Sequence, residues 1–195
     1  MGWHGAYSRG VSNVKGSALT SRLLWVSLNH GEAGMARLAE AASPTLRAVV
    51  REGASRATWY QFEMFVELNQ KIDELFGKGD LALVKELGRY GADANLTTIY
   101  RLFYKVGTVQ WILSRASRLW GMHYDAGRMI VRAPGGREVE LEIMDYDTPH
   151  RTHCLSVEGW IERSVELSGG KDVALDELDC RARGGARCRM RVRWS

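Results

Sequence analysis

The sequence contains three cysteines whose positions would allow them to hold a metal ion. Cys180 and Cys188 are equally far from Gly184, so their thiols would face each other across a hairpin that turns there. Zinc prefers tetrahedral sites that are rich in sulfur, and Cys154 with the carboxylate of Glu177 would complete a set of four ligands. Because no coordination position would stay open, this zinc would be structural.

Other interpretations of the thiols remain open. Cysteines without a ligand are most often small buried hydrophobic residues, so all three could simply pack the core. Glu177 and Cys180 are an odd number of residues apart and would point to opposite faces of a regular strand. A shared metal would therefore need a bulge between them. Asp179 and His153 are substitute ligands. The odd number of cysteines argues against a disulfide framework.

Aromatic residues are densest where the helical pattern gives way to strands. Small aromatic molecules bind in apolar pockets that are lined by such side chains and by one or two polar groups. Alternatively, an aromatic stripe at helical spacing packs the core, and His123 at a helix end interacts with the helix dipole. The candidate ligand-binding residues are Phe103, Tyr104, Trp111, Trp120, His123 and Tyr124.

The composition is that of one globular domain. The 195 residues are 45% hydrophobic and 26% charged, which predicts a single domain over residues 1–195 with a loosely ordered segment at 1–14. No apolar run is long enough to span a bilayer or to act as a signal peptide, so we expect a cytoplasmic protein without a membrane span.

The positive charge is concentrated near the end of the sequence. Six of the 27 basic residues are arginines between Arg181 and Arg193, which leaves 21 against 23 acidic residues elsewhere. We therefore expect no specific binding to nucleic acid, and at most weak, salt-sensitive binding to polyanions. Alternate arginines on an exposed strand face also protect a sheet edge against pairing.

The elements that must position these residues follow from hydrophobic periodicity. In Trp59–Phe76 the apolar residues recur every three or four positions, which predicts a long amphipathic helix. After Asp125 the period changes to two, which predicts strands. The fold class is therefore α+β, with a helical half followed by β-β-α-β-β and a mostly antiparallel sheet. The expected helices cover 21–30, 35–42, 43–53, 59–76, 80–94, 99–106, 109–124 and 157–167, and the expected strands cover 129–133, 139–144, 172–182 and 187–194.

Several runs of sequence resemble a paralogous family of myxobacterial proteins. They are KGSALTSRL at Lys15, WYQFEMFVELNQKID at Trp59, YRLFYKVG at Tyr100, TPHRTHCLSVEGWIERSVELSGG and CRARGGARCRMRVRW. The C-terminal part also resembles the 4-vinyl reductase domain, a module that binds small molecules. That domain shares the nitric-oxide signalling and Golgi-transport fold with haem nitric-oxide sensors and TRAPP-type tethering subunits.

The resemblance implies a set of metal ligands. Phenol-responsive activators with this domain hold a structural zinc by a Cys, a Glu-x-x-Cys and a final Cys, an order that Cys154, Glu177, Cys180 and Cys188 reproduce. No ATPase module or helix-turn-helix follows, so direct transcriptional activation is not implied. The proximal histidine and the Tyr-x-Ser-x-Arg pattern of haem sensors are missing, so we expect no haem.

These patterns predict a non-catalytic sensory or regulatory domain that binds a small apolar or aromatic ligand. The alternative is a dimeric interaction module of the tethering-subunit type, which would use Trp59–Phe76 and Gly91-Ala92 as its surface and bind a signalling protein. A homodimer is expected in both cases. An enzyme is not expected, because the sequence has no nucleotide-binding fingerprint and no Gly-x-Ser-x-Gly. His150 and His153 near two aspartates could act as acid and base, but such loops are usually just solvated.

Overall fold

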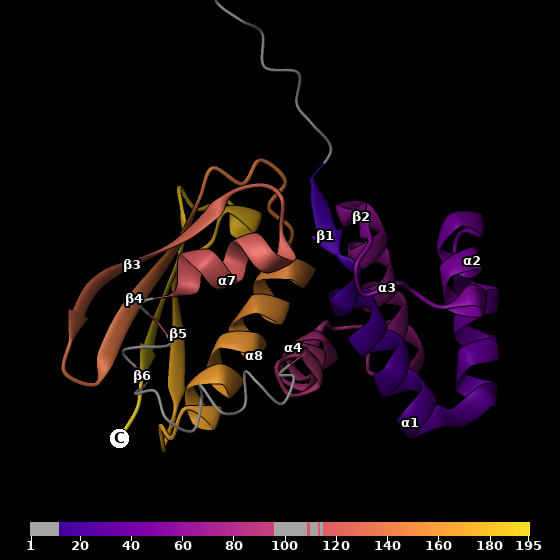
Figure 1. The fold of residues 1–195 in the computed structure, drawn as a ribbon, viewed down its shortest axis with the longest axis horizontal. Helices are drawn as coiled ribbons and strands as arrows, with labels where there is room; N and C mark the ends of the chain where they lie inside the picture. The colour runs from indigo at the N-terminus through magenta and orange to yellow at the C-terminus, as the bar shows by residue number, and fades with distance from the viewer. Residues whose placement is uncertain (1–11, 96–108, 110–112, 114) are drawn as a thin grey trace, which may run out of the picture.

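The computed structural model describes residues 12–95, 109, 113 and 115–195. A helical half comes first, and a half built on an antiparallel sheet lies beside it (Figure 1). This arrangement confirms the predicted α+β fold class. In the described part of the chain, no helix is both long and apolar enough to cross a membrane.

The helical half consists of four helices and a small two-stranded sheet. Glycine at position 31, with φ 62° and ψ −159°, breaks the first helix where the sequence predicted an end. The Ser43 side chain accepts a hydrogen bond from the backbone N–H of Leu46, which confirms the predicted helix start before Pro44. The elements are β1 (Asn13–Lys15), α1 (Gly16–Ala41), α2 (Pro44–Glu52), β2 (Trp59–Gln61), α3 (Phe62–Phe76) and α4 (Ala82–Asn95).

Two expectations for this half need correction. The segment Trp59–Gln61 pairs with Asn13–Lys15 as β2 instead of starting the helix, so α3 begins at Phe62. Of the expected loose segment at 1–14, residues 1–11 lie outside the described residues, and Val14 is fully buried in β1. The expected helix at 99–106 also lies outside the described residues.

The second half is a four-stranded antiparallel sheet with order β3-β4-β6-β5 and helices beside it. The helix expected at 157–167 begins earlier, because the His150 side chain accepts a hydrogen bond from the Thr152 N–H and caps it. The strand expected to reach Ala182 ends at Asp179, after a bulge. The elements are α7 (Ala116–His123), β3 (Arg128–Gly135), β4 (Glu138–Met144), α8 (Arg151–Leu167), β5 (Ala174–Asp179), the 3-10 turn η1 (Arg181–Arg183) and β6 (Cys188–Arg193).

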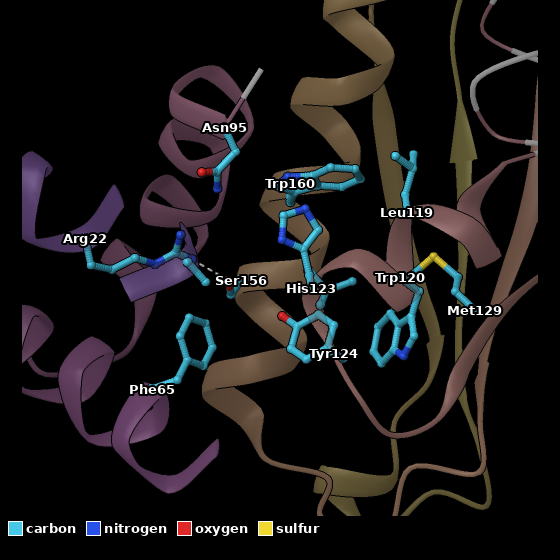
Figure 2. A pocket seen from close by; sticks show the side chains of 12 residues that line it. Arg22, Phe65, Asn95, Leu119, Trp120, His123, Tyr124, Met129, Ser156 and Trp160 are labelled. Carbon is cyan, nitrogen blue, oxygen red and sulfur yellow. Dashed lines mark hydrogen bonds between the residues drawn. The ribbon is translucent and has the colours of Figure 1, made fainter. Parts of the chain in front are cut away.

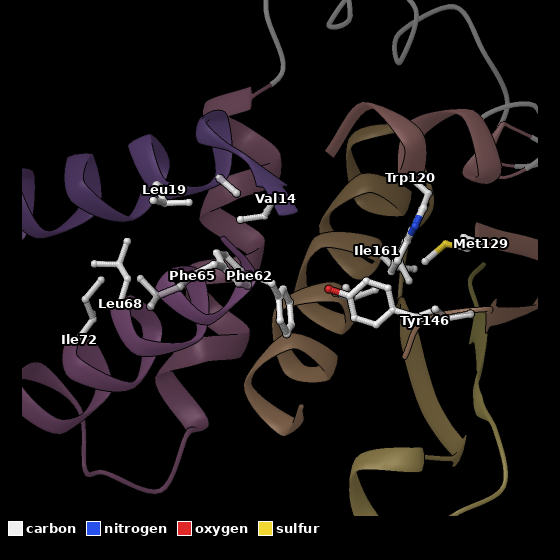
Figure 3. Packing of buried hydrophobic residues seen from close by; sticks show 14 of the residues in the cluster. Val14, Leu19, Phe62, Phe65, Leu68, Ile72, Trp120, Met129, Tyr146 and Ile161 are labelled. Atoms are coloured by element: carbon white, nitrogen blue, oxygen red, sulfur yellow. The ribbon is translucent and has the colours of Figure 1, made fainter. Parts of the chain in front are cut away.

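The two halves meet where α4 packs on α8. A Cβ atom at Gly88 would lie 2.2 Å from the carbonyl oxygen of Ser156, and one at Gly159 would lie 2.0 Å from that of Lys85. The backbones of the helices therefore touch directly, and only glycine allows this approach. The hydrophobic core continues across the contact from Phe62 and its neighbours to the aromatic side chains of the sheet half (Figure 3).

Candidate functional site

A small pocket lies between the two halves of the molecule. Its volume is about 50 Å³, it is partly open to solvent, and side chains from α1, α3, α4, α7, α8 and β3 line it (Figure 2). Most of the lining is apolar or aromatic, which is typical of sites for small molecules. The lining residues are Ala18, Arg22, Phe65, Asn95, Leu119, Trp120, His123, Tyr124, Met129, Ser156, Val157 and Trp160.

The aromatic wall of the pocket is held in place by the start of the sheet half. The indole N–H of Trp120 donates a hydrogen bond of 2.8 Å to the Ala126 carbonyl, which fixes the ring at the end of α7. The rings of Trp120 and Tyr124 lie 4.4 Å apart between centroids. Trp160 of α8 meets the His123 ring edge to face at 6.0 Å. These rings form a surface against which a flat apolar molecule could pack.

Two ionisable side chains of this wall stay neutral. Burial, with smaller contributions from Arg22 and Arg56, lowers the pKa of His123 to about 4. Burial also raises the pKa of Tyr124 well above its usual value. At neutral pH the imidazole therefore offers a nitrogen lone pair and the phenol remains protonated. Both groups can orient a ligand by hydrogen bonding without adding charge.

Arg22 of α1 is the one strongly buried cation of the described pocket lining, with 3% of its surface exposed. Its Nε donates to Asn69 Oδ1 at 3.1 Å, its Nη1 to Ser21 Oγ at 3.0 Å and its Nη2 to Ser156 Oγ at 2.6 Å. Burial lowers the pKa of this guanidinium to about 10, so it stays charged at neutral pH. The sequence analysis missed this residue.

A signal for Arg22 was present in the sequence. The position lies three residues after Leu19 and four before Val26, both of which are fully buried, so it falls on the apolar face of its helix. A charged residue on such a face is a candidate for a functional role, because an unpaired buried charge destabilises the fold.

The sequence-predicted ligand-binding residues divide into two groups. Trp120, His123 and Tyr124 line the pocket, as expected from their spacing. The other three, Phe103, Tyr104 and Trp111, lie outside the described residues.

His153, a substitute metal ligand in the sequence analysis, belongs to an aromatic cluster behind the pocket. Its ring is 2% exposed and lies 5.0 Å from Tyr146 and 4.8 Å from Tyr124 between centroids. Burial, together with the nearby His150, lowers the pKa of His153 to about 3. In the described part of the chain no group forms a hydrogen bond with its Nε2 atom. An enclosed imidazole that is neutral near pH 7 and is protonated only in strong acid does not suit acid and base catalysis at neutral pH.

The three cysteines converge, but the predicted fourth ligand does not join them. The Cys180 thiol donates to Cys154 Sγ at 3.6 Å, and the Cys154 thiol donates to Cys188. That second hydrogen bond lowers the pKa of Cys188 to about 6 and, with burial, strongly raises the pKa of Cys154. The Glu177 carboxylate instead pairs with two arginines, Arg151 and Arg183.

Residues of the expected dimer surface are buried by contacts within one copy of the chain. Phe65, Leu68 and Ile72 of α3 are fully buried, and a Cβ atom at Gly91 would lie 2.5 Å from Arg22 Nη1. These residues therefore cannot form the contact between two copies.

Four of the six arginines between Arg181 and Arg193 form ion pairs with carboxylates of the sheet. Arg191 Nη2 lies 2.7 Å from Glu140 Oε1, and Arg193 Nη2 lies 2.7 Å from Asp176 Oδ2. Weak binding to polyanions remains a prediction.

Solved H-NOX structures share this fold. An H-NOX protein from S. oneidensis in the Fe(II)NO ligation state is 13% identical, with a TM-score of 0.73 over 93% of this chain and 99% of that chain. An oxygen-binding H-NOX domain related to soluble guanylate cyclases is 13% identical, with a TM-score of 0.66 over 93% of this chain and 95% of that chain. A structure that probes haem distortion in the H-NOX family is 15% identical, with a TM-score of 0.66 and the same coverage.

At these identities the likeness shows the fold and nothing finer. It agrees with the predicted nitric-oxide signalling fold, whereas the resemblance to the myxobacterial family and to the 4-vinyl reductase domain stays a prediction. No protein-family model matches the chain, and no curated protein matches it.

The predicted cofactor assignment, a structural zinc and no haem, is wrong. The solved structures that share the fold include proteins described by their haem or by their Fe(II) state. Among the described residues, no group of three or more His, Cys, Asp or Glu side chains has an arrangement that could hold a metal ion, and this includes the three cysteines. The physical reason is visible at Glu177, whose charge is already neutralised by Arg151 and Arg183.

The donor chemistry of the pocket fits haem. The neutral imidazole of His123 is the form that ligates iron. Aromatic side chains surround it, and Arg22 supplies positive charge. The volume of the pocket is about 50 Å³, so a porphyrin would require the lining side chains to separate.

Proposed function

We propose that this chain is a non-catalytic sensory domain, folded as one domain over residues 1–195, that binds a small, flat, apolar or aromatic molecule between its two halves. The observation that carries the proposal is the pocket itself, which combines an aromatic wall with a neutral imidazole and a buried guanidinium. Haem is the first candidate ligand, because proteins that share the fold are described by their haem.

The place of the pocket supports a sensory role. Its lining comes from both halves, and the halves meet at the close contact between α4 and α8. A bound molecule would contact side chains of both halves, so binding would change how the halves pack against each other. This is the means by which the domain would pass a signal to a protein partner.

We infer no acid and base catalysis from the two histidines at the start of α8. The histidines of the expected acid and base pair are His150, which caps α8, and His153, which is enclosed by rings. A homodimer remains a prediction, which light scattering against the 21.9 kDa mass of one chain would test.

The test reduces the volume of the pocket with a larger side chain. Ala18 of α1 lines it, and Ala18→Leu would occupy part of the space. Ala36→Leu on the exposed face of the same helix is the matched control. Haem binding, followed by its visible absorption, and phenol binding, followed by calorimetry, should weaken at least ~10-fold in the first variant and stay unchanged in the second. Equal binding by both variants, or no binding by the unaltered protein, would overturn the proposal.

A further inference from the structure

Arg22 is charged, enclosed and surrounded only by neutral partners. Among the described residues its three acceptors are a Ser21 hydroxyl, an Asn69 amide oxygen and a Ser156 hydroxyl, and its guanidinium lies 5.2 Å from the centre of the Phe65 ring. A guanidinium has five N–H groups, so the described residues accept hydrogen bonds from three of them. Two donors remain for a ligand.

No carboxylate of this protein compensates the charge. All Asp and Glu residues of the sequence fall within the described residues, and none of them forms an ion pair with Arg22. Half-buried ionic groups on α4 and α8 do have partners of opposite charge, as Arg89 does with Glu166 and Arg163 with Asp93. Burying a charge without a counter-charge is strongly unfavourable, so this arrangement suggests that the counter-charge arrives with a ligand.

The space around Arg22 is shaped for it. A Cβ atom at Gly91 of α4 would lie only 2.5 Å from Arg22 Nη1, so the guanidinium rests where α4 has no side chain. Ser156 Oγ, at 2.6 Å from Nη2, orients the other edge toward the pocket. Figure 2 shows the side chain reaching from the helical half toward Ser156 and His123. The guanidinium is therefore positioned in advance and does not need to move on binding.

We propose that the ligand of this pocket is an organic acid with an apolar or aromatic body, and that its carboxylate is seated against the guanidinium of Arg22. This inference rests on the proposed function and deepens it, because it names the chemical class of the ligand. Arginine suits the role, since its planar fork makes two parallel hydrogen bonds to a carboxylate. The aromatic wall of Trp120 and Tyr124 takes the body of the molecule.

The test compares probes that differ only at the acid group. trans-Cinnamate and cinnamyl alcohol share one body, and calorimetry gives both affinities. Haem and its dimethyl ester form a second pair, because haem propionates carry the same group. Arg22→Gln removes the charge and keeps a hydrogen-bond donor. Arg193→Gln, at the exposed end of β6, is the control for loss of one arginine.

The expected result is a loss of affinity for the acids and not for their neutral counterparts. Arg22→Gln should weaken binding of the preferred acid by ~10- to 100-fold and leave its neutral counterpart unchanged, whereas Arg193→Gln should change neither. If the effect is confined to the haem pair, the carboxylate comes from haem. If it is confined to the cinnamate pair, the carboxylate comes from a free acid. Either result supports the proposal.

Other outcomes overturn it and separate it from the proposed function. If an acid and its neutral counterpart bind equally well, or if Arg22→Gln keeps the preference for the acid, this inference fails while the sensory pocket stands. If no probe binds the unaltered protein, the proposed function fails and this inference fails with it.

A second variant and a ligand-free measurement cover the case in which Arg22 is needed for folding. Arg22→Lys keeps the charge and should keep a reduced preference for the acid, because an ammonium cannot form the paired hydrogen bonds. Without ligand, Arg22→Gln should melt at or above the temperature of the unaltered protein, since an uncompensated buried charge is removed. A lower melting temperature together with equal binding of acid and alcohol by Arg22→Lys would show a purely structural role.

Discussion

Replacing Gly88 with alanine tests the backbone contact that joins the two halves. The new Cβ atom would lie 2.2 Å from the carbonyl oxygen of Ser156 and 3.0 Å from its Cα atom. These neighbours belong to the backbone of α8, so no side-chain rotation can make room. The helices α4 and α8 would have to separate.

The size of the effect follows from the geometry. An ordinary contact begins near 3.4 Å, so the backbones must move apart by roughly 1 Å at this point. Inserting an atom into a well-packed interior costs about 1–3 kcal/mol. Alanine is a better helix former than glycine and offsets about 1 kcal/mol of this. The difference is a loss of up to about 2 kcal/mol in the free energy of unfolding of Gly88→Ala.

Urea unfolding followed by circular dichroism measures this change. Gly121→Ala is the matched control, because Gly121 lies in α7 and a Cβ atom there would meet no heavy atom within 4 Å. The control should be unchanged or more stable by up to ~1 kcal/mol. If Gly88→Ala is as stable as the control, the two helices do not touch through their backbones, and the account of the contact is wrong.

Three further predictions concern titration. Burial raises the pKa of Glu158 from 4.5 to about 7, so the folded state should lose stability as pH rises through that interval, and Glu158→Gln should flatten the urea-unfolding profile there. Burial lowers the pKa values of His123 and His153 to about 4 and about 3, so the stability of the folded state should fall as pH drops below 6.5. Proton NMR should show both rings still neutral at pH 5. Protonation of either ring near pH 6 would contradict its burial. The hydrogen bond from Cys154 lowers the pKa of Cys188 to about 6, so Cys154→Ala should raise that pKa. The ultraviolet absorbance of the thiolate measures the change. An unchanged titration of Cys188 would contradict the hydrogen bond.

Local patterns in the sequence were enough to predict the class of fold and several element boundaries. The helix start at Ser43 and the break at Gly31 depend on a single residue and its own backbone. The alternation in Cys188–Arg193 predicted β6, because successive side chains of a strand face opposite sides. Helical spacing likewise identified Trp120 and His123, which both line the pocket.

Only the tertiary structure decided which groups partner one another. Trp59–Gln61 has a helical pattern but pairs with Asn13–Lys15, and the strand partner lies far away in the sequence. Glu177 has the sequence spacing of a metal ligand, but in the folded chain its carboxylate forms an ion pair with Arg151 of α8.

Arg22 shows the same division between sequence and structure. Its place on an apolar helix face could be inferred from the sequence, because helical spacing is a local property. That it faces Ser156 of α8 and meets no carboxylate depends on how α1, α4 and α8 pack. Periodicity reports which face of an element is buried, whereas the identity of the buried neighbours is settled only when elements distant in the chain come together.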